Sequence, residues 1–239
     1  MKLSAAIQNL LFEISQIFET SHFGASNSNY SNLIIRHDLD FSLTAGLILS
    51  EAERNLGINS QFFVRTSGNS YNAASALSRI ELTSIGDLQE IGIHIDPPSF
   101  FSNYQDFQSN LKISKEIIEN ITSKEVKIAS FHRPKPSDLN GCEEIEGLIN
   151  MYSTSLFMDR MYISDSANSW GKEKYIQLFA DLNRTKKIQL LLHPEWWFDD
   201  NGKKSFLICL KNEFEKSLIE LQSENRIFAG GISFQDFLR

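Results

Sequence analysis

Apolar and polar residues along this chain alternate with two different periods, which predict strands and helices in turn. Short apolar runs bounded by polar or turn-forming residues are typical of strands buried in a parallel sheet. The clearest run is 33–35, which is followed directly by His37, Asp38 and Asp40. The other predicted strands are 61–65, 90–96, 126–131 and 188–192, with weaker candidates at 155–158 and 161–164.

Apolar residues repeat at helical spacing between these strands. Residues 1–20 form such an amphipathic segment, in which Gln8, Glu13 and Gln16 interrupt the apolar positions. This pattern predicts a helix that packs on a core, and it differs from the continuous apolar stretch of a signal peptide. Further helices are predicted at 42–55, 103–121, 143–151, 174–182 and 205–221, with short helical pieces at 73–78 and 84–89.

The alternation of strands and helices continues along the chain without a repeat or a break in composition. It predicts one α/β domain over residues 1–239, with the helix of residues 1–20 packed on it. About seven strands fit a distorted (β/α)7 barrel, complete or slightly open. A doubly wound parallel sheet is the alternative, because hydrophobic periodicity does not separate the two folds.

The net charge, the apolar runs and the cysteine content argue against several classes of partner and site. The formal net charge is −7 and no cluster of lysine and arginine offsets it, so we expect no nucleic-acid partner. No apolar run approaches the length of a membrane span. Cys142 and Cys209 lie far apart and imply neither a disulfide framework nor a zinc ribbon. We therefore expect a cytoplasmic protein, and its oligomeric state stays open.

Four of the five histidines follow an apolar run at the same relative place. They are His37, His94, His132 and His193. One histidine at a strand end is usually structural, whereas four in successive predicted strands indicate a common site. The carboxyl ends of parallel strands are the edge at which α/β folds build their sites.

Two imidazoles and a carboxylate with an open coordination position are typical of a hydrolytic zinc site. Asp40, His94 and one further ligand would supply it. Asp38 would project on the same face of the strand as Asp40 and act as the general base. We expect Arg133 to pair with Asp38 and to keep it ionised. His193 on the distant last strand would protonate the leaving group.

Each of these residues also has a structural explanation. Arg133 beside two prolines fits a surface turn, Asp165 fits a helix cap, and His193 before a proline fits the end of a strand. The functional interpretation is favoured for the set as a whole, because the candidates stand at successive strand ends.

Five segments in order carry a family resemblance: RHDLDFS, EIGIHID, SFHRPKP, SDSANSW and LLLHPEWW. Over roughly residues 30–197 the chain resembles the polysaccharide deacetylase family, the NodB-homology deacetylases. It is most similar to the divergent branch with an HD-x-D first motif, which is associated with bacterial surface-polysaccharide biosynthesis. The resemblance implies a distorted barrel of about seven strands that binds Zn²⁺ or another divalent transition metal.

The first two motifs imply the base and the metal ligands. Asp38 matches the family's general base, Asp40 its metal-binding aspartate, and His94 the histidine that opens the second motif. The sequence departs from the family at two places. Leu39 separates aspartates that are adjacent in the family, and Pro98 stands where a second metal-binding histidine is expected.

The third metal ligand must therefore come from elsewhere, and His132 and Asp96 are the candidates. We prefer His132, because imidazole suits zinc and His132 ends the neighbouring predicted strand. Asp96 is then expected to contact the substrate.

The remaining motifs imply further roles. Arg133 matches the arginine that braces the base, and His193 matches the general acid. Asp165 and Trp170 are the candidates for the aspartate and tryptophan of the fourth motif. Trp170 and Trp196 would bind substrate by stacking on sugar faces.

Together these features predict a metal-dependent deacetylase that removes acetate from an N-acetylated sugar during the biosynthesis of a surface glycan or glycolipid precursor. Two alternatives stay open. The missing histidine is consistent with a carbohydrate-binding protein that kept the barrel and lost the chemistry. The same catalytic groups would also serve a metal amidohydrolase that acts on a non-sugar amide.

Overall fold

The computed structural model describes residues 1–18, 20, 32–68, 70–166 and 187–225. Its strands are β1 Leu33–Leu39, β2 Gln61–Val64, β3 Glu90–Ile95, β4 Ile128–Phe131, β5 Glu144–Ile145, β6 Leu148–Asn150, β7 Met161–Ser164 and β8 Ile188–Leu192. They form one curled sheet in the order β5-β6-β4-β3-β2-β1-β8-β7. All neighbouring pairs are parallel except β5 with β6.

The strand order is that of a barrel opened at one seam. The first strand along the chain, β1, pairs with both the second strand, β2, and the last strand, β8. Strands from the two ends of the sequence therefore lie side by side in the sheet. The described residues contain no pairing between β7 and the β5–β6 hairpin, so the seam lies there. The predicted α/β barrel-type fold of about seven strands is therefore confirmed, with seven parallel strands and one short antiparallel one.

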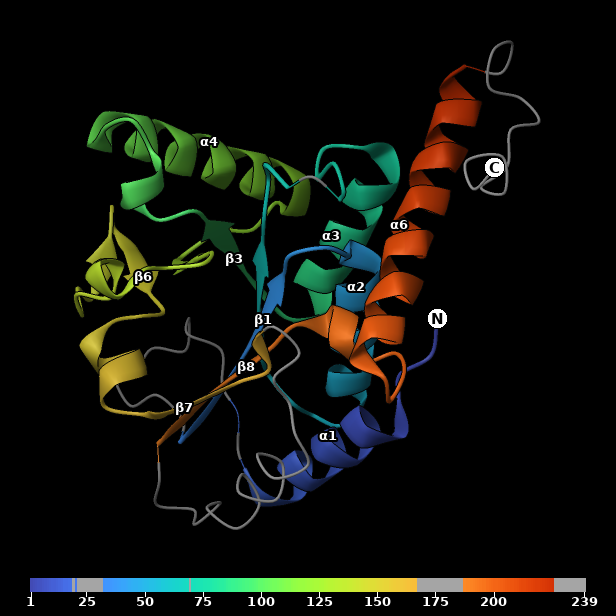
Figure 1. Ribbon diagram of the computed structural model, residues 1–239, viewed down its shortest axis with the longest axis horizontal. Helices are drawn as coiled ribbons and strands as arrows, with labels where there is room; N and C mark the ends of the chain where they lie inside the picture. Colours follow the sequence, from blue (N-terminus) through green and yellow to red (C-terminus); the bar gives the residue numbers. More distant parts are fainter. Residues whose placement is uncertain (19, 21–31, 69, 167–186, 226–239) are drawn as a thin grey trace.

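Helices cover the outer side of this sheet (Figure 1). They are α1 Ala5–Ile17, α2 Leu43–Asn55, α3 Ala76–Leu88, α4 Tyr104–Thr122 and α6 Gly202–Glu224. α3 packs between α2 and α4, and α6 packs against both α2 and α3. α1 lies at the opposite end of the molecule from α4 (Figure 1) and buries Ile7, Leu10 and Ile14. No helix in the described ranges combines the length and the apolar character that a membrane span needs.

Polar side chains fix where these helices begin. Ser42 accepts a hydrogen bond from the backbone N–H of Ala45 at the start of α2. Asn103 and Asn201 cap α4 and α6 in the same way. Such caps satisfy backbone donors that have no partner within the helix. The helices predicted at 1–20, 42–55, 103–121 and 205–221 are confirmed.

Close packing beside the site depends on Gly92 in β3. A Cβ atom at this position would lie 2.6 Å from Cε1 of Phe63 and 2.7 Å from Cγ1 of Ile128. Both neighbours belong to adjacent strands on the sheet face opposite the helices. Only glycine therefore fits between them, two residues before His94.

Two predicted elements are wrong, and two others are parts of one longer helix. The helix predicted at 143–151 is the β5–β6 hairpin, because Glu146 and Gly147 both have positive φ, +50° and +77°, and form its two-residue turn. The weak strand at 155–158 is the π-helical turn Thr154–Met158. The two short pieces at 73–78 and 84–89 belong to the single helix α3. The helix predicted at 174–182 lies outside the described residues.

Candidate metal and catalytic site

The carboxyl ends of the central strands surround one cavity of about 880 Å³. Asp38 and Asp40 stand at the end of β1, and His94 is the fifth residue of β3. His132 and His193 directly follow β4 and β8. All five side chains line this cavity, so residues from four strands far apart in the sequence meet in one place.

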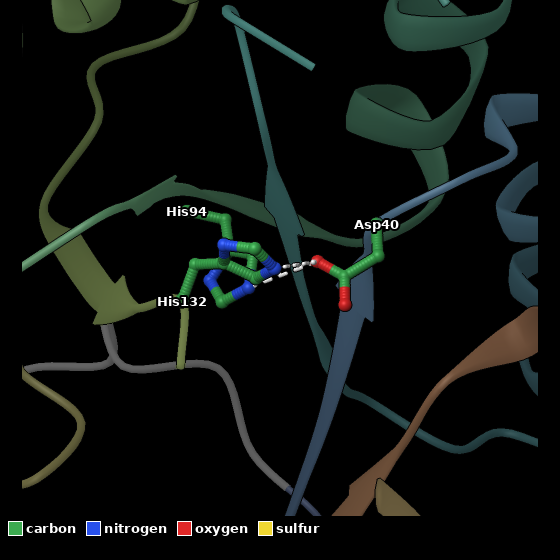
Figure 2. A group of neighbouring side chains, drawn as sticks. All are labelled: Asp40, His94 and His132. Atoms are coloured by element: carbon green, nitrogen blue, oxygen red, sulfur yellow. Dashed lines mark ion pairs between the residues drawn. The ribbon is translucent and has the colours of Figure 1, made fainter. Parts of the chain in front are cut away.

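Asp40, His94 and His132 form a group in which one ligand atom of each residue lies within 4.8 Å of the other two (Figure 2). Nε2 of His94 lies 3.2 Å from Oδ1 of Asp40, and Nε2 of His132 lies 3.6 Å from the same oxygen. Ligands about 2.1 Å from a shared zinc at tetrahedral angles are themselves about 3.4 Å apart. The spacing therefore fits one zinc-sized ion.

The Asp40 carboxylate supplies a second sign of a metal site. Its Oδ1 atom is buried and has no hydrogen-bond partner among the described residues. Burial acts to raise the pKa of Asp40, but the imidazoles of His94, His132 and His193 lower it below its usual range. An ionised oxygen that is buried without a donor is costly unless a cation binds it. The donor set thus fits a divalent metal.

Hydrogen bonds orient both imidazoles toward Asp40. Nδ1 of His94 lies 3.2 Å from the carbonyl oxygen of Ser130 and donates to it. Nδ1 of His132 lies 2.9 Å from Oδ1 of Asp96 and donates to this carboxylate. In both rings the lone pair is then on Nε2, as a metal ligand requires.

The geometry groups one of the two candidate third ligands with Asp40 and His94. His132 joins Asp40 and His94, whereas Asp96 is not part of the group and instead orients His132. Burial lowers the pKa of His132, and the neighbouring Arg65 acts in the same direction, so the ring is neutral at pH 7. Nη1 of Arg65 lies 2.9 and 3.0 Å from the two ring nitrogens.

Asp38 is paired with Arg36, and the predicted pairing with Arg133 is wrong. Nε and Nη2 of Arg36 donate to Oδ1 and Oδ2 of Asp38 at 2.9 and 2.7 Å, and Nη2 also donates to the hydroxyl of Tyr152. Burial acts to raise the pKa of Asp38, but the charge of Arg36 lowers it, so the carboxylate is ionised at neutral pH. Oδ2 of Asp38 also lies 3.5 Å from Nε2 of His94.

Arg133 lies on the outer rim of the cavity. Its side chain is 67% exposed, and its backbone has a φ of +50°. Its Nε lies 3.2 Å from Nδ1 of His132, and its Nη2 lies 3.7 Å from Asp96. The sequence motif placed an arginine beside the site, but backbone direction after β4 turns it away from Asp38.

His193 is held by a buried carboxylate on the other side of the cavity. Oδ1 of Asp165 accepts a hydrogen bond from Nδ1 of His193 at 2.6 Å, and Trp197 donates to Oδ2 at 2.8 Å. Burial acts to lower the pKa of His193, but the hydrogen bond and charge of Asp165 raise it to about 10. The imidazole is therefore protonated at neutral pH, with Nε2 lying 3.8 Å from Oδ2 of Asp40.

The other aromatic and histidine candidates lie in different surroundings. Trp196 lines the cavity, whereas Trp170 lies outside the described residues. His37 points to the opposite face of β1, where its Nε2 lies 2.7 Å from Glu53, so it belongs to the packing under α2.

Sequence reasoning missed three ionisable residues of the cavity region, Arg36, Arg65 and Glu195. Arg36 was detectable, because residues i and i+2 of a strand share a face and Arg36 stands two positions before Asp38. Glu195 is fully buried beside His193 in the short 3₁₀ helix Pro194–Trp196, and no sequence pattern distinguishes it from a surface glutamate.

No family model and no curated protein matches the chain. Among solved structures it resembles the catalytic domain of a peptidoglycan N-acetylglucosamine deacetylase from Eubacterium rectale, with 16% identity and a TM-score of 0.45 over 75% of this chain and 84% of the other. The Xyl-CE4 domain of a multidomain xylanase from the hindgut metagenome of Trinervitermes trinervoides gives 15% identity and a TM-score of 0.48, over 84% of this chain and 94% of the other.

A third similar structure is a mutant of BA3943, described as a CE4 family pseudoenzyme with restored enzymatic activity. It gives 12% identity and a TM-score of 0.46, over 77% of this chain and 63% of that chain. This chain therefore spans less than two thirds of that protein. These values describe a distant likeness of fold.

Proposed function

We propose that this protein is a divalent-metal-dependent deacetylase that releases acetate from an N-acetylated sugar. The observation that carries the proposal is the convergence of three groups of different chemistry in one cavity. They are the possible metal ligands Asp40, His94 and His132, the ionised carboxylate of Asp38, and the protonated imidazole of His193.

The Nε2 atoms of His94 and His132 and the Oδ1 atom of Asp40 would hold the ion. A divalent metal bound by such groups polarises an acyl carbonyl and lowers the pKa of water, and the two imidazoles favour Zn²⁺ or a similar transition metal. Ser130 and Asp96 fix the two imidazole rings through their Nδ1 atoms, so the ligand atoms are oriented before an ion arrives.

Asp38 and His193 divide the proton transfers of amide hydrolysis. Asp38 accepts a proton from the water that attacks the acyl carbonyl carbon. The C–N bond then breaks, and the departing nitrogen takes a proton from Nε2 of His193, which gives acetate and a free amine. Their opposite protonation states at pH 7 suit these roles, because Arg36 keeps Asp38 ionised and Asp165 keeps His193 protonated.

The sugar class rests on the order of the five sequence motifs and on the cavity. A volume of about 880 Å³ exceeds what a small amide needs and lies within the range of ligand pockets. Aromatic side chains on the cavity wall, including Phe41, Trp196 and Phe206, offer apolar faces for a sugar ring. The resemblance to the surface-polysaccharide branch favours a glycan or glycolipid precursor as the substrate, and we infer one catalytic domain over residues 1–239.

The alternative of a carbohydrate-binding protein without catalysis was motivated by Pro98, which stands in place of a metal-binding histidine. His132 lies close enough to Asp40 and His94 to complete a possible three-ligand group. This grouping supports the enzyme over the binding protein.

The test is acetate release from a set of N-acetylated sugars by protein loaded with Zn²⁺, with bound metal measured by elemental analysis. We expect about one ion per chain together with acetate release that Asp38→Asn abolishes. A folded protein that holds the metal and leaves every N-acetylated sugar intact would contradict the proposal. Cleavage of simple non-sugar amides alone would identify a general amidohydrolase instead.

A further inference from the structure

Glu195 is a buried carboxyl group in the wall of the cavity with no assigned task. It lies two residues after His193, its exposed fraction is 1%, and it lines the same cavity as the metal group. Neither Oε1 nor Oε2 has a hydrogen-bond partner among the described residues. Its backbone is fixed, because the carbonyl oxygen of Glu195 accepts a hydrogen bond of 2.6 Å from Ser205.

Two other glutamates among the described residues, Glu53 and Glu213, are also fully buried, and their contacts are those of structural residues. Glu53 contacts Nε2 of His37 at 2.7 Å and accepts a hydrogen bond of 2.5 Å from Ser60. Glu213 accepts a hydrogen bond of 2.8 Å from Ser42 and pairs with Lys216 at 2.5 Å. Each of these two side chains therefore links separate parts of the fold, whereas the carboxyl oxygens of Glu195 have no hydrogen-bond partner in the described part of the chain.

An unsatisfied buried carboxyl group costs free energy of folding. Burial raises the pKa of Glu195 to about 8, so the group is neutral at pH 7. Even a neutral carboxyl group that is buried without hydrogen-bond partners lowers the stability of the fold relative to one that is hydrogen-bonded. An apolar side chain at this position would avoid that cost, so the carboxyl group indicates a ligand that supplies the missing hydrogen bonds.

The residues beside Glu195 indicate the chemistry of this ligand. Nε1 of Trp196 is also buried without a hydrogen-bond partner among the described residues. The Trp196 ring packs on Phe206 with centroids 5.4 Å apart, and Phe206 meets Phe41 edge to face at 5.0 Å. All three rings line the cavity, so polar groups in need of partners lie next to apolar faces.

We propose that Glu195 is a sugar-binding residue, whose carboxyl group hydrogen-bonds hydroxyl groups of the ring that carries the acyl group. This inference rests on the proposed function, and it names the residue that selects a sugar over other amides. A neutral carboxyl has both a donor and acceptors, which matches hydroxyl groups that also donate and accept. The apolar face of the sugar lies on the rings of Phe41, Trp196 and Phe206, and the Trp196 indole N–H donates to a sugar oxygen.

The experiment compares Glu195→Leu and Glu195→Gln with the wild type, all loaded with Zn²⁺. The probes are the methyl glycosides of N-acetylglucosamine, N-acetylgalactosamine and N-acetylmannosamine, and affinity is measured by titration of tryptophan fluorescence. We expect Glu195→Leu to unfold at the same or a higher temperature, to keep its metal, and to bind the preferred glycoside about 10-fold or more weakly. Glu195→Gln retains donor and acceptor atoms, so its affinity for the glycoside should lie between those of the wild type and Glu195→Leu.

Glu213→Gln is the matched control, because Glu213 is equally buried but already has partners and does not line the cavity. It should lower the unfolding temperature and leave the affinity for the glycoside unchanged. A Glu195→Leu variant that is strongly destabilised, or that binds the glycoside as well as the wild type does, overturns the inference.

The readout is equilibrium binding, so it is separate from the test of catalysis. A protein that binds a glycoside through Glu195 but releases no acetate would contradict the proposed deacetylase and support the sugar-binding role. A protein that hydrolyses simple amides with its metal bound, yet binds none of the three glycosides, would overturn the role of Glu195 and leave the catalytic centre intact.

Discussion

Arg36 and Asp38 lie two residues apart on β1, and the guanidinium of Arg36 donates a hydrogen bond to each oxygen of the Asp38 carboxylate. Both side chains are almost completely buried. A buried ion pair of this geometry fixes the direction of the carboxylate and keeps it charged, which a general base at neutral pH needs.

The first prediction compares Arg36, which pairs with Asp38, with Arg133 on the rim of the cavity. Arg36→Met removes one partner of a buried pair, so we expect a loss of about 3–5 kcal/mol in the free energy of unfolding. Arg133→Gln changes a side chain that is 67% exposed, and its effect should stay within about 0.5 kcal/mol. Urea denaturation of both variants measures the difference. Equal losses would show that Arg133 shares the bracing of Asp38.

The second prediction separates the metal ligands from the base. Asp40→Ala and His94→Ala should abolish metal binding, because a three-ligand site that loses one ligand keeps little affinity. Asp38→Asn should keep the metal and lower the rate on the order of 10²–10⁴-fold, since it removes only the proton acceptor. Elemental analysis and acetate release are measured on the same preparations. Metal loss in Asp38→Asn would place Asp38 among the ligands.

The third prediction distinguishes His132 from Asp96. His132→Ala should lose metal as completely as His94→Ala does. Asp96→Asn should weaken metal affinity by about 10–100-fold without abolishing it, because Asp96 acts only on the orientation of the His132 ring. Competition with a chelator of known affinity gives both values. Undiminished metal affinity in His132→Ala would make Asp96 the ligand instead.

The fourth prediction is a dependence of stability on pH through His193. The pKa of His193 is raised from 6.5 to about 10 in the folded protein, so the folded state binds the imidazole proton more tightly than the unfolded state does. The stabilising contribution is therefore complete below the unfolded pKa of 6.5 and is lost as the pH rises through about 10.

The stability difference between the wild type and His193→Gln should shrink with rising pH in this window, by up to about 1.4 kcal/mol per pH unit. Denaturation of metal-free protein at several pH values measures it. Asp165→Asn should flatten the same slope, because Asp165 is the main group that raises the pKa of His193. A difference that stays constant across this pH window would show that His193 is already neutral in the folded state at pH 7.

The fifth prediction tests packing beneath the site. Gly92→Ala places a Cβ atom 2.6 Å from Phe63 and should destabilise the protein by about 1–3 kcal/mol. Gly68→Ala is the control, because the atom nearest to the added Cβ would be Cβ of Arg65, at an ordinary contact distance of 3.7 Å. Thermal unfolding of the two variants gives the comparison, and equal melting temperatures would mean that β3 shifts at no cost.

Local sequence patterns were sufficient to predict most of the strands and helices and the edge of the sheet that carries the candidate site. Apolar runs marked β1, β3, β4 and β8, and their carboxyl ends are where the histidines stand. The two-residue period of a strand placed Asp38 and Asp40 on one face. Both inferences depend only on local geometry, which a short stretch of sequence contains. The hairpin β5–β6 was not predicted. Its acidic residues are also typical of the first turn of a helix, so the turn at Glu146 and Gly147 was not recognised.

Which side chains contact one another follows from the packing of the strands and could not be predicted from local patterns. His94 lies beside Ser130 in the register of β3 with β4, and this register brings His132 rather than Asp96 to the metal group. The same packing turns Arg133 outward and leaves Arg36 as the partner of Asp38. It also buries the Glu195 carboxyl group with no hydrogen-bond partner among the residues that the structure describes. Register, strand twist and burial arise from contacts between residues far apart in the sequence, so the local pattern of hydrophobic residues does not predict them.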